Sequence, residues 1–146
     1  MKTITSIFAA MMLVACNGLN TAEAAGEITT HNGPIKKCGS AKRITCIVDG
    51  DTIWLDGEKL RLKDFDTPEP TTNICGGEKE RKLAAKASAR LSDLLNNNAW
   101  TVERFGLGKY KRRIVTIRVK DKDVGDILIQ ERLARSWPDG DEWWCN

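Results

Sequence analysis

The spacing of hydrophobic and polar residues predicts that the first ordered part of the chain is β-sheet. Residues 43–48 (RITCIV), 52–55 (TIWL) and 59–63 (KLRLK) are short segments rich in β-branched or alternating apolar side chains, as strands are. The pair Asp56 and Gly57 between the last two segments is a strong signal for a two-residue hairpin turn. Because side chains alternate along a strand, one face of this hairpin is expected to form core: Ile53, Leu55, Leu60 and Leu62.

Residues 78–95 change to the period of a helix. Acidic residues stand near the start of this segment, and the three asparagines 96–98 follow its end. The apolar residues at helical spacing predict one buried stripe: Leu83, Ala87, Leu91, Leu94 and Leu95.

Two more strands and a short helix are predicted after the long helix. The strands are residues 100–105 (WTVERF) and 113–119 (RIVTIRV), and Asp123 is placed to cap a helix over 124–134. Its inward side would carry Ile127, Leu128 and Leu133. The order of three strands, a helix, two strands and a helix predicts an α+β, mainly β fold. It suits an OB-type five-stranded Greek-key β-barrel with one long and one short helix, which commonly binds nucleic acids or sugar chains.

The first 25 residues are expected to be a signal peptide rather than part of the fold. The apolar run 4–15 has signal-peptide length and is too short to span a bilayer. Its end, LVAC (13–16), resembles the lipobox of bacterial lipoproteins, in which cleavage before Cys16 leaves that residue lipidated. AEAA (22–25) offers an alternative cleavage after Ala24. Either ending predicts an extracytoplasmic protein, periplasmic or secreted, with a possible lipid anchor.

The remaining residues predict one folded domain behind a short tail. Residues 26–37 are small and polar without a period, so we expect a flexible tail that includes His31, to which we assign no role. The domain is expected to span 38–146. A hydrophobic fraction of 41% and a charged fraction of 29% fit an ordinary soluble protein. The net charge of +3 is compatible with a polyanionic partner and does not establish one.

Four cysteines remain once Cys16 is set aside. An even number in an exported chain predicts two disulfides, with three pairings open. Zinc is disfavoured because the sequence has no C-x-x-C pair and a single histidine. The candidates are Cys38, Cys46, Cys75 and Cys145.

Carboxylates gather in two turn-rich segments on either side of the predicted hairpin. Asp49 and Asp51 flank a glycine, and Asp64, Asp66 and Glu69 lie in a loop stiffened by prolines. Each motif taken alone is ordinary turn chemistry. Carboxylates brought together from separate loops repel one another, and a hard divalent cation with oxygen ligands neutralises them.

Three sequence elements together resemble the staphylococcal nuclease-like, or thermonuclease, family. They are DGDT (49–52), Arg61 placed five residues before DTPE (66–69), and a tyrosine followed by an arginine in KYKRRIV (109–115). They occur in order, with the hairpin and the long helix between them, and the resemblance covers about residues 43–135.

The resemblance implies a metal site and a general base. Asp51 and Asp66 would bind Ca²⁺ together with the backbone carbonyl of Thr67, and Glu69 would activate the attacking water. Three other charged residues match no role in the family: Asp49, Asp64 and Arg113.

The resemblance also implies a phosphate site. Arg61 and Arg112 would stabilise the five-coordinate transition state, while Lys109 and Tyr110 would contact a substrate phosphate. Guanidinium groups suit this role because they donate two parallel hydrogen bonds to phosphate and stay charged.

The implied function is a calcium-dependent endonuclease, monomeric, that cuts DNA and RNA, preferring single-stranded or frayed regions, and leaves 3′-phosphate ends. A catalytically inactive nucleic-acid-binding OB module is the alternative, and a structural envelope lipoprotein is a third possibility. The presence of all five site side chains favours the enzyme: Asp51, Arg61, Asp66, Glu69 and Arg112.

One geometric requirement follows from strand alternation. In a flat hairpin, Asp51 shares a face with Ile53, whereas Arg61 points to the opposite face. The two side chains can meet only if the chain bends or bulges near Gly50.

The C-terminal segment departs from the long form of the family. No residue after Leu133 matches the tyrosines that stack on the terminal nucleoside there, and Trp137 is the nearest aromatic substitute. We expect instead that three tryptophans close the open end of the barrel: Trp137, Trp143 and Trp144. Pairing Cys75 with Cys145 would fasten this segment to the start of the long helix and leave Cys38 to pair with Cys46.

Overall fold

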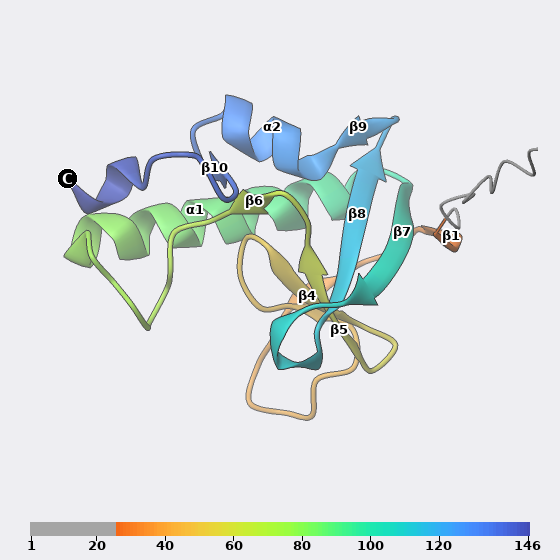
Figure 1. Ribbon diagram of the computed structural model, residues 1–146. Helices are drawn as coiled ribbons and strands as arrows, with labels where there is room; N and C mark the ends of the chain where they lie inside the picture. Colours follow the sequence, from red (N-terminus) through yellow and green to blue (C-terminus); the bar gives the residue numbers. More distant parts are fainter. Residues whose placement is uncertain (1–25) are drawn as a thin grey trace, which may run out of the picture.

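A computed structural model describes residues 26–146 of the chain (Figure 1). The expectations for the leader, including lipidation at Cys16, lie outside the described residues. Among the described helices, none has the length and apolar character needed to cross a membrane. The elements are β1 (Ile28–His31), β2 (Lys36–Lys37), β3 (Cys46–Ile47), β4 (Thr52–Leu55), β5 (Glu58–Leu62), β6 (Phe65–Asp66), α1 (Gly77–Asn96), β7 (Trp100–Leu107), η1 (Lys109–Lys111), β8 (Arg113–Val119), β9 (Lys122–Asp123), α2 (Val124–Gln130), β10 (Arg135–Ser136) and η2 (Trp143–Cys145).

One curled sheet dominates the fold. Its strand order is β1-β7-β8-β5-β4-β3-β2, with β9 paired to β8, while β6 and β10 form a separate two-stranded sheet. The main sheet curls into a half-barrel, and α1 runs across it (Figure 1). The prediction of a mainly β, OB-type α+β fold with one long and one short helix is confirmed. The sheet has more strands than the five predicted, because the short strands β1, β2 and β9 join it.

The hairpin that carries part of the site forms at the predicted place. Asp56 and Gly57 both have left-handed backbone angles, with φ of 51° and 84°, as a two-residue type I′ turn requires. The register pairs Ile53 with Leu60. The four apolar residues predicted to share a face are between 0% and 3% exposed, so this face is the core: Ile53, Leu55, Leu60 and Leu62.

The long helix packs one stripe against the sheet, close to the prediction. α1 buries Ala87, Leu91, Leu94 and Leu95 as expected, whereas Leu83 is half-buried and the neighbouring alanine takes its place. The buried stripe also includes a carboxylate, Glu80, which is 1% exposed. A buried charge at this position needs partners, and it finds them at the functional site described below.

The tail predicted over residues 26–37 is instead part of the folded domain. β1 pairs with β7, and the ring of His31 stacks on Trp100 with centroids 4.8 Å apart. β2 pairs with β3, and Ile35 is buried, with its N–H and C=O both bonded to the side chain of Asn96. The prediction failed because these short strands have no local periodicity and form only by pairing with distant segments.

Two other predicted elements are shorter in the structure. β3 keeps only the end of the strand expected over 43–48, because the preceding residues form an exposed loop. α2 begins as expected, with the Asp123 side chain accepting a hydrogen bond of 2.7 Å from Gly125 N–H. It ends at Gln130 rather than at 134, since Arg132 adopts a left-handed φ of 55°. Leu128 is fully buried, and two partly buried residues pack beside it: Ile127 and Leu133.

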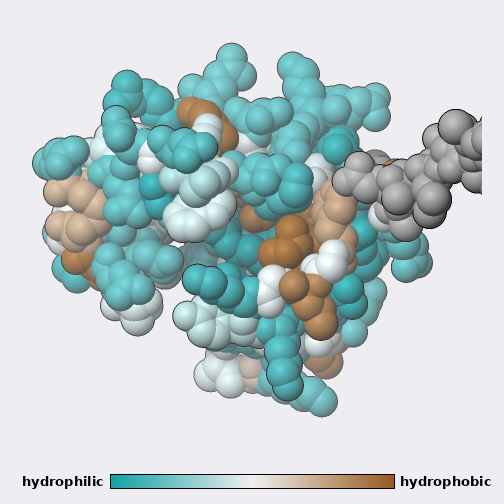
Figure 2. All heavy atoms as spheres, viewed as in Figure 1, coloured by the Kyte–Doolittle hydropathy of each residue, from teal (hydrophilic) through white to brown (hydrophobic). Residues whose placement is uncertain are grey.

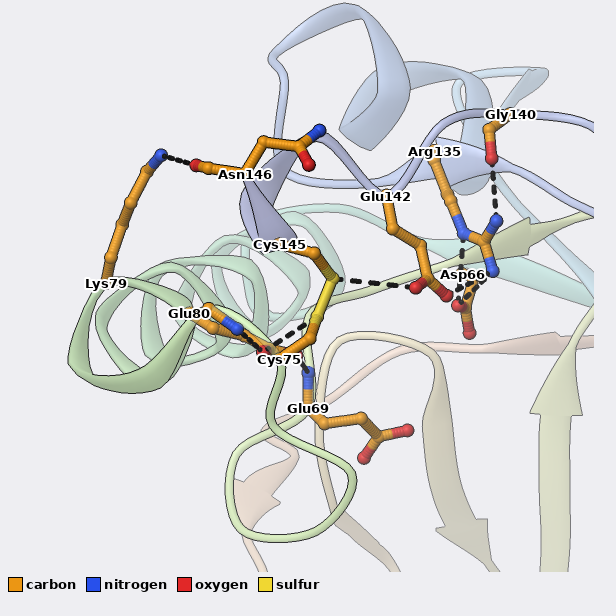
Figure 3. The surroundings of a disulfide bond; sticks show 11 residues. Asp66, Glu69, Cys75, Lys79, Glu80, Arg135, Gly140, Glu142, Cys145 and Asn146 are labelled. Carbon is orange, nitrogen blue, oxygen red and sulfur yellow. Dashed lines mark hydrogen bonds and ion pairs between the residues drawn. A yellow bond between two sulfur atoms is a disulfide. The ribbon is translucent and has the colours of Figure 1, made fainter.

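Both cysteine pairs are joined as predicted. Cys38 bonds Cys46, and Cys75 bonds Cys145, which fastens η2 to the residues before α1 (Figure 3). Trp144 is buried there, with its carbonyl so close to Gly76 that a Cβ at Gly76 would clash.

The tryptophans do not close the barrel as a group. Trp144 is buried beside the start of α1, Trp143 is partly exposed, and Trp137 is 53% exposed. The expectation of a three-tryptophan plug is therefore wrong. The physical reason for the difference is that β10 pairs with β6, so the segment after α2 runs beside β6.

Candidate active site

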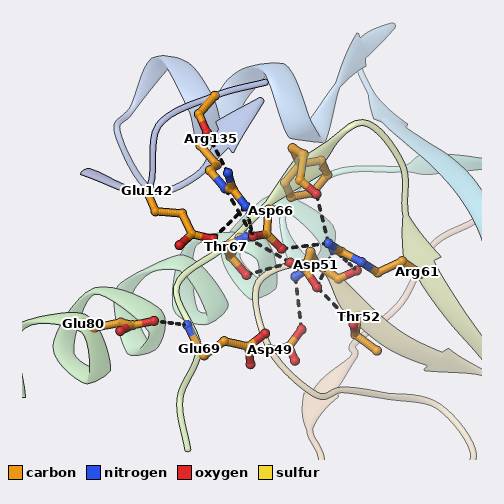
Figure 4. Close-up of polar contacts among 12 residues, drawn as sticks. Asp49, Asp51, Thr52, Arg61, Asp66, Thr67, Glu69, Glu80, Arg135 and Glu142 are labelled. Carbon is orange, nitrogen blue, oxygen red and sulfur yellow. Dashed lines mark hydrogen bonds and ion pairs between the residues drawn. The ribbon is translucent and has the colours of Figure 1, made fainter. Parts of the chain in front are cut away.

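Arg61 connects two acidic segments at the centre of the site (Figure 4). Its Nη1 lies 2.5 Å from Asp51 Oδ1, and its Nη2 lies 2.9 Å from Asp66 Oδ1. Nη2 also donates to the backbone carbonyl of Phe65 at 3.1 Å. Since the Arg61 side chain is only 14% exposed, these contacts are largely shielded from water.

Asp51 reaches Arg61 because the chain bends before β4. Asp51 lies one residue ahead of that strand, so the alternation of the hairpin does not fix its direction. At Gly50 the backbone packs so closely that a Cβ would lie 2.7 Å from Thr67 Cγ2 and 2.9 Å from Ala87 Cβ. The backbone bends at residues 49–51, as expected near Gly50, and the close packing leaves room only for glycine there.

Both carboxylate oxygens of Asp51 also accept hydrogen bonds from nearby threonines. Its Oδ2 accepts hydrogen bonds from both the backbone N–H and the hydroxyl of Thr67, each at 3.0 Å. Thr52 donates its hydroxyl to Oδ1 at 3.0 Å. The carboxylate therefore joins the turn before β4 to the loop after β6, and both it and Thr67 are buried.

Asp66 has a second guanidinium partner that the sequence did not reveal. Arg135 is its register partner across the β6–β10 pair and donates to Asp66 Oδ2 through Nη2 at 3.1 Å and Nε at 3.3 Å. Arg135 is itself held by Glu142 and by the carbonyl of Gly140. No local pattern marks this residue, because its role depends on the pairing of two strands far apart in sequence.

Asp49 also belongs to the site, although the sequence indicated only a turn. Its carboxylate accepts a hydrogen bond of 3.2 Å from the backbone N–H of Asp51, and it points toward Glu69 (Figure 4). Burial, and then the nearby charge of Asp51, raise the pKa of Asp49 to about 7. The only feature of the sequence that could have placed Asp49 in the site is the presence of two aspartates in DGDT.

The other two acids are perturbed in the same direction. Burial raises the pKa of Asp66, with a further contribution from the charge of Asp51. Burial also raises the pKa of Glu69, followed by the charges of Asp51 and Asp66. Four carboxylates (Asp49, Asp51, Asp66 and Glu69) thus share this cluster with the guanidinium groups of Arg61 and Arg135, and the cluster keeps a surplus of negative charge.

Glu80 holds the loop that carries Glu69. Its Oε1 accepts a hydrogen bond of 3.0 Å from the backbone N–H of Glu69, and its Oε2 accepts one of 2.8 Å from Gly76 (Figures 3 and 4). The Cys75–Cys145 disulfide lies beside this contact. A buried side chain of α1 and a covalent bond therefore restrain both ends of the loop.

The acid cluster opens into a cleft of about 650 Å³ that also collects the cationic residues of the third motif. Arg112 lines it, with its guanidinium carbon 5.6 Å from the ring centre of Tyr110 and its Nε donating to the Lys109 carbonyl. Within the described part of the chain, Arg112 forms no ion pair with a carboxylate, in contrast to Arg61. Lys109 and Tyr110 line the same cleft, and Tyr110 is 85% exposed.

Trp137 lies at this cleft rather than in the core. It lines the cleft with its indole, over which the Arg135 guanidinium is placed at 5.1 Å. Trp137 therefore provides an aromatic surface beside the site. In the sequence it is the nearest aromatic substitute for the family's nucleoside-stacking tyrosines.

Two of the residues without an assigned role make other contacts. Asp64 is exposed and pairs with Lys63 at 2.6 Å. Arg113 bonds Glu58 at 2.8 Å and the carbonyl of Phe105, so it stabilises the strands. A separate group of possible metal ligands formed by Cys75, Glu142 and Cys145 is no metal site, because its two sulfurs form the disulfide.

A comparison with protein families gives one match. The family model described as staphylococcal nuclease homologue matches residues 59–141, which is more than half of the chain. The matched segment includes Arg61, Asp66, Glu69 and Arg112, while Asp51 lies before it. No curated protein matches the chain.

Proposed function

Because the chain belongs to the staphylococcal nuclease homologue family, we propose that it is a calcium-dependent endonuclease that hydrolyses phosphodiester bonds of DNA and RNA. The observation that best supports this proposal is the meeting of Arg61 with Asp51 and Asp66 in one cleft with Glu69. The view in Figure 2 shows a mostly hydrophilic surface, which suits a polar, charged substrate. Single-stranded or frayed regions are the expected substrates, because a groove of this fold follows an unpaired backbone.

The acid cluster fits a hard divalent cation. Its donors are oxygens, and the pKa values of Asp49, Asp66 and Glu69 are raised first by burial and then by the charge of Asp51, so a bound cation would stabilise their ionised forms. Asp51, Asp66 and the carbonyl of Thr67 would hold Ca²⁺, as the family resemblance implies. When bound, the ion would neutralise charge on a non-bridging phosphate oxygen.

Glu69 would act as the general base. Its carboxylate would take a proton from the water whose oxygen attacks phosphorus. The bond from phosphorus to the 5′ oxygen of the next nucleotide would break, that oxygen would take up a proton from water to become a hydroxyl, and a 3′-phosphate would remain. A pKa raised above the ordinary glutamate value brings this base closer to a working pH near neutrality. The Glu80 contact to its backbone would keep the carboxylate in position.

The arginines would stabilise the charge that develops on phosphate. Arg61 and Arg112 line the cleft together with Glu69. Loss of one such donor typically costs on the order of 3 kcal/mol of transition-state stabilisation. Lys109 and Tyr110 would contact a phosphate of the same strand.

We further propose that the protein acts outside the cytoplasm as a monomer. Its two disulfides are compatible with such a location, since they persist in oxidising compartments. Removal of the leader remains part of this proposal, either by cleavage before Cys16, which would then carry a lipid anchor, or by cleavage after Ala24.

Digestion of denatured DNA with the purified protein, in Ca²⁺ and in EDTA, tests the function. We expect substrate loss in Ca²⁺ and none in EDTA. Retarded but intact DNA on a native gel would indicate a binding module instead. If the protein neither cleaves nor retards the DNA, both the nuclease and the binding module are contradicted.

A further inference from the structure

We propose that the cleft continues along the outer face of the β4–β5 hairpin to a second binding site, the hairpin hollow, which holds single-stranded nucleic acid away from the scissile bond. The hairpin hollow is lined by Lys42, Arg43, Ile44, Trp54, Asp56 and Gly57. This inference rests on the proposed nuclease function and extends it to substrate length.

Strand alternation places the hollow and the catalytic arginine on one face. The register pairs Thr52 with Arg61 and Trp54 with Lys59, so these residues share the face opposite to the buried Ile53. Lys59 lines the catalytic cleft, and its cross-strand partner Trp54 lines the hairpin hollow. The two sites are therefore continuous through one pair of neighbouring side chains.

The hairpin hollow is built into the fold rather than formed by loose side chains. The N–H of Gly57 donates to the Ile44 carbonyl at 2.9 Å, and the N–H of Asp56 donates to the Thr45 hydroxyl at 3.0 Å. The Cys38–Cys46 disulfide closes the loop that carries its basic wall. A site that is ordered before binding loses less conformational entropy when a ligand binds.

The chemistry of the hairpin hollow suits a nucleic-acid strand. Lys42 and Arg43 are exposed cations, Trp54 is half-buried and offers an aromatic surface, and Ile44 is 55% exposed beside them. Asp56 is the single acid in the lining, and it accepts a hydrogen bond from Thr45. Cations for the backbone together with an aromatic surface for stacking are the combination that binds single strands without sequence preference.

The distance between Arg61 and the hairpin hollow sets the length of substrate that would reach both. Arg61 lies four residue steps after Gly57 along β5 and its turn, which corresponds to about 13 Å of strand. At a rise of about 3.4 Å per stacked nucleotide, roughly four nucleotides cover this span. A trinucleotide bound at Arg61 would therefore not reach Arg43, whereas a 20-nucleotide strand would.

Cleavage of these two DNA substrates tests the inference with the Lys42→Ala/Arg43→Ala variant and with Trp54→Ala. A matched control, Lys82→Ala/Lys86→Ala, removes the same charge from exposed positions of α1. For the 20-mer we expect KM to rise about tenfold in each hollow variant while kcat stays unchanged. For the trinucleotide neither constant should change in Lys42→Ala/Arg43→Ala, and Trp54→Phe should recover most of the 20-mer affinity. The slope of log KM against log salt should fall by about 1.4 when two cations are removed.

The outcomes separate this inference from the proposed function. Equal KM values for the 20-mer in the wild type and the hollow variants, with normal cleavage, would overturn the hollow and leave the nuclease intact. If the wild type cleaves neither substrate, the proposed function fails. Fluorescence anisotropy of the labelled 20-mer then tests the hairpin hollow alone. Weaker binding by Lys42→Ala/Arg43→Ala than by the control would support the inference. Equal binding by the two variants would overturn it.

Discussion

At the residue scale, the site is a balance between acids that repel one another and two arginines that hold them. Arg61 bridges Asp51 and Asp66, and Arg135 takes the remaining oxygen of Asp66. Asp49 has no cationic partner within the described residues and carries the largest perturbation, with its pKa raised to about 7. The folded state therefore favours protonated Asp49 more than the unfolded state does. Its contribution to stability is fully present below the ordinary pKa of 3.8 and is lost as pH rises through 7.

The Asp49→Asn variant should be more stable than the wild type in EDTA at pH 8. Asparagine removes the charge and keeps an oxygen that can accept from the N–H of Asp51. Three pKa units correspond to an upper bound of about 4 kcal/mol, so a gain on the order of 2 kcal/mol is expected from urea unfolding. The gain should shrink at pH 5, and the exposed Asp64→Asn should show none. Equal gains at both pH values would contradict the raised pKa.

At the element scale, one helix holds the loop of the proposed general base, Glu69, through a buried carboxylate. Glu80 accepts the N–H groups of Glu69 and Gly76, one with each oxygen, and is 1% exposed. The N-terminal end of α1 therefore positions the backbone of the proposed general base. A residue outside the proposed metal and phosphate ligands would thus be part of the geometry that the proposed catalysis needs.

The Glu80→Gln variant tests this contact. Glutamine replaces one acceptor oxygen by a donor, so one of the two N–H groups is left without a buried partner. We expect a loss of about 1 to 3 kcal/mol in the free energy of unfolding. Because the loop shifts, kcat should fall by about tenfold to a hundredfold, with KM little changed. The matched control is Glu78→Gln, an exposed residue of the same helix that bonds Arg81. A variant that loses stability and keeps full kcat would show that Glu80 only supports the fold.

The elements also show where sequence reasoning succeeds. The hairpin, α1 and β8 follow from local signals, namely the Asp56–Gly57 turn, an apolar stripe and β-branched alternation. β1 and the pairing of Arg135 with Asp66 depend on strands joined across long stretches of chain, which no local pattern encodes. The same limit explains why the position of Trp137 was predicted wrongly. Its hydrophobicity indicated a place in the core, but the pairing of β10 brings it to the cleft.

At the scale of the whole molecule, the Cys75–Cys145 disulfide holds the C-terminal segment over the site. That segment supplies Arg135 and Trp137 to the cleft, and its anchor lies next to the loop of Glu69 (Figure 3). The other disulfide, Cys38–Cys46, closes the loop of the hairpin hollow and lies on a different part of the sheet.

Removing the two disulfides in turn should have unequal effects. Chain entropy predicts a cost of about 4 kcal/mol for the bond that spans 70 residues and about 2.5 kcal/mol for the one that spans 8. We expect the Cys75→Ser/Cys145→Ser variant to lose more thermal stability than Cys38→Ser/Cys46→Ser, as measured by calorimetry. It should also lose more activity on a trinucleotide, because the Glu69 loop and Arg135 are released together. The reverse order in both measurements would contradict this account.

The most direct test of the metal-dependent phosphodiesterase site is the cleavage rate of single-stranded DNA by the wild type, Glu69→Gln and Arg61→Ala at saturating Ca²⁺. Circular dichroism melting and Ca²⁺ titration calorimetry on the same samples would show whether each variant remains folded and still binds the ion. The account predicts that Glu69→Gln loses about a thousandfold in kcat while its fold and Ca²⁺ affinity are retained. Arg61→Ala should lose at least a hundredfold. Near-normal rates in both variants, or equal wild-type cleavage in EDTA, would contradict it.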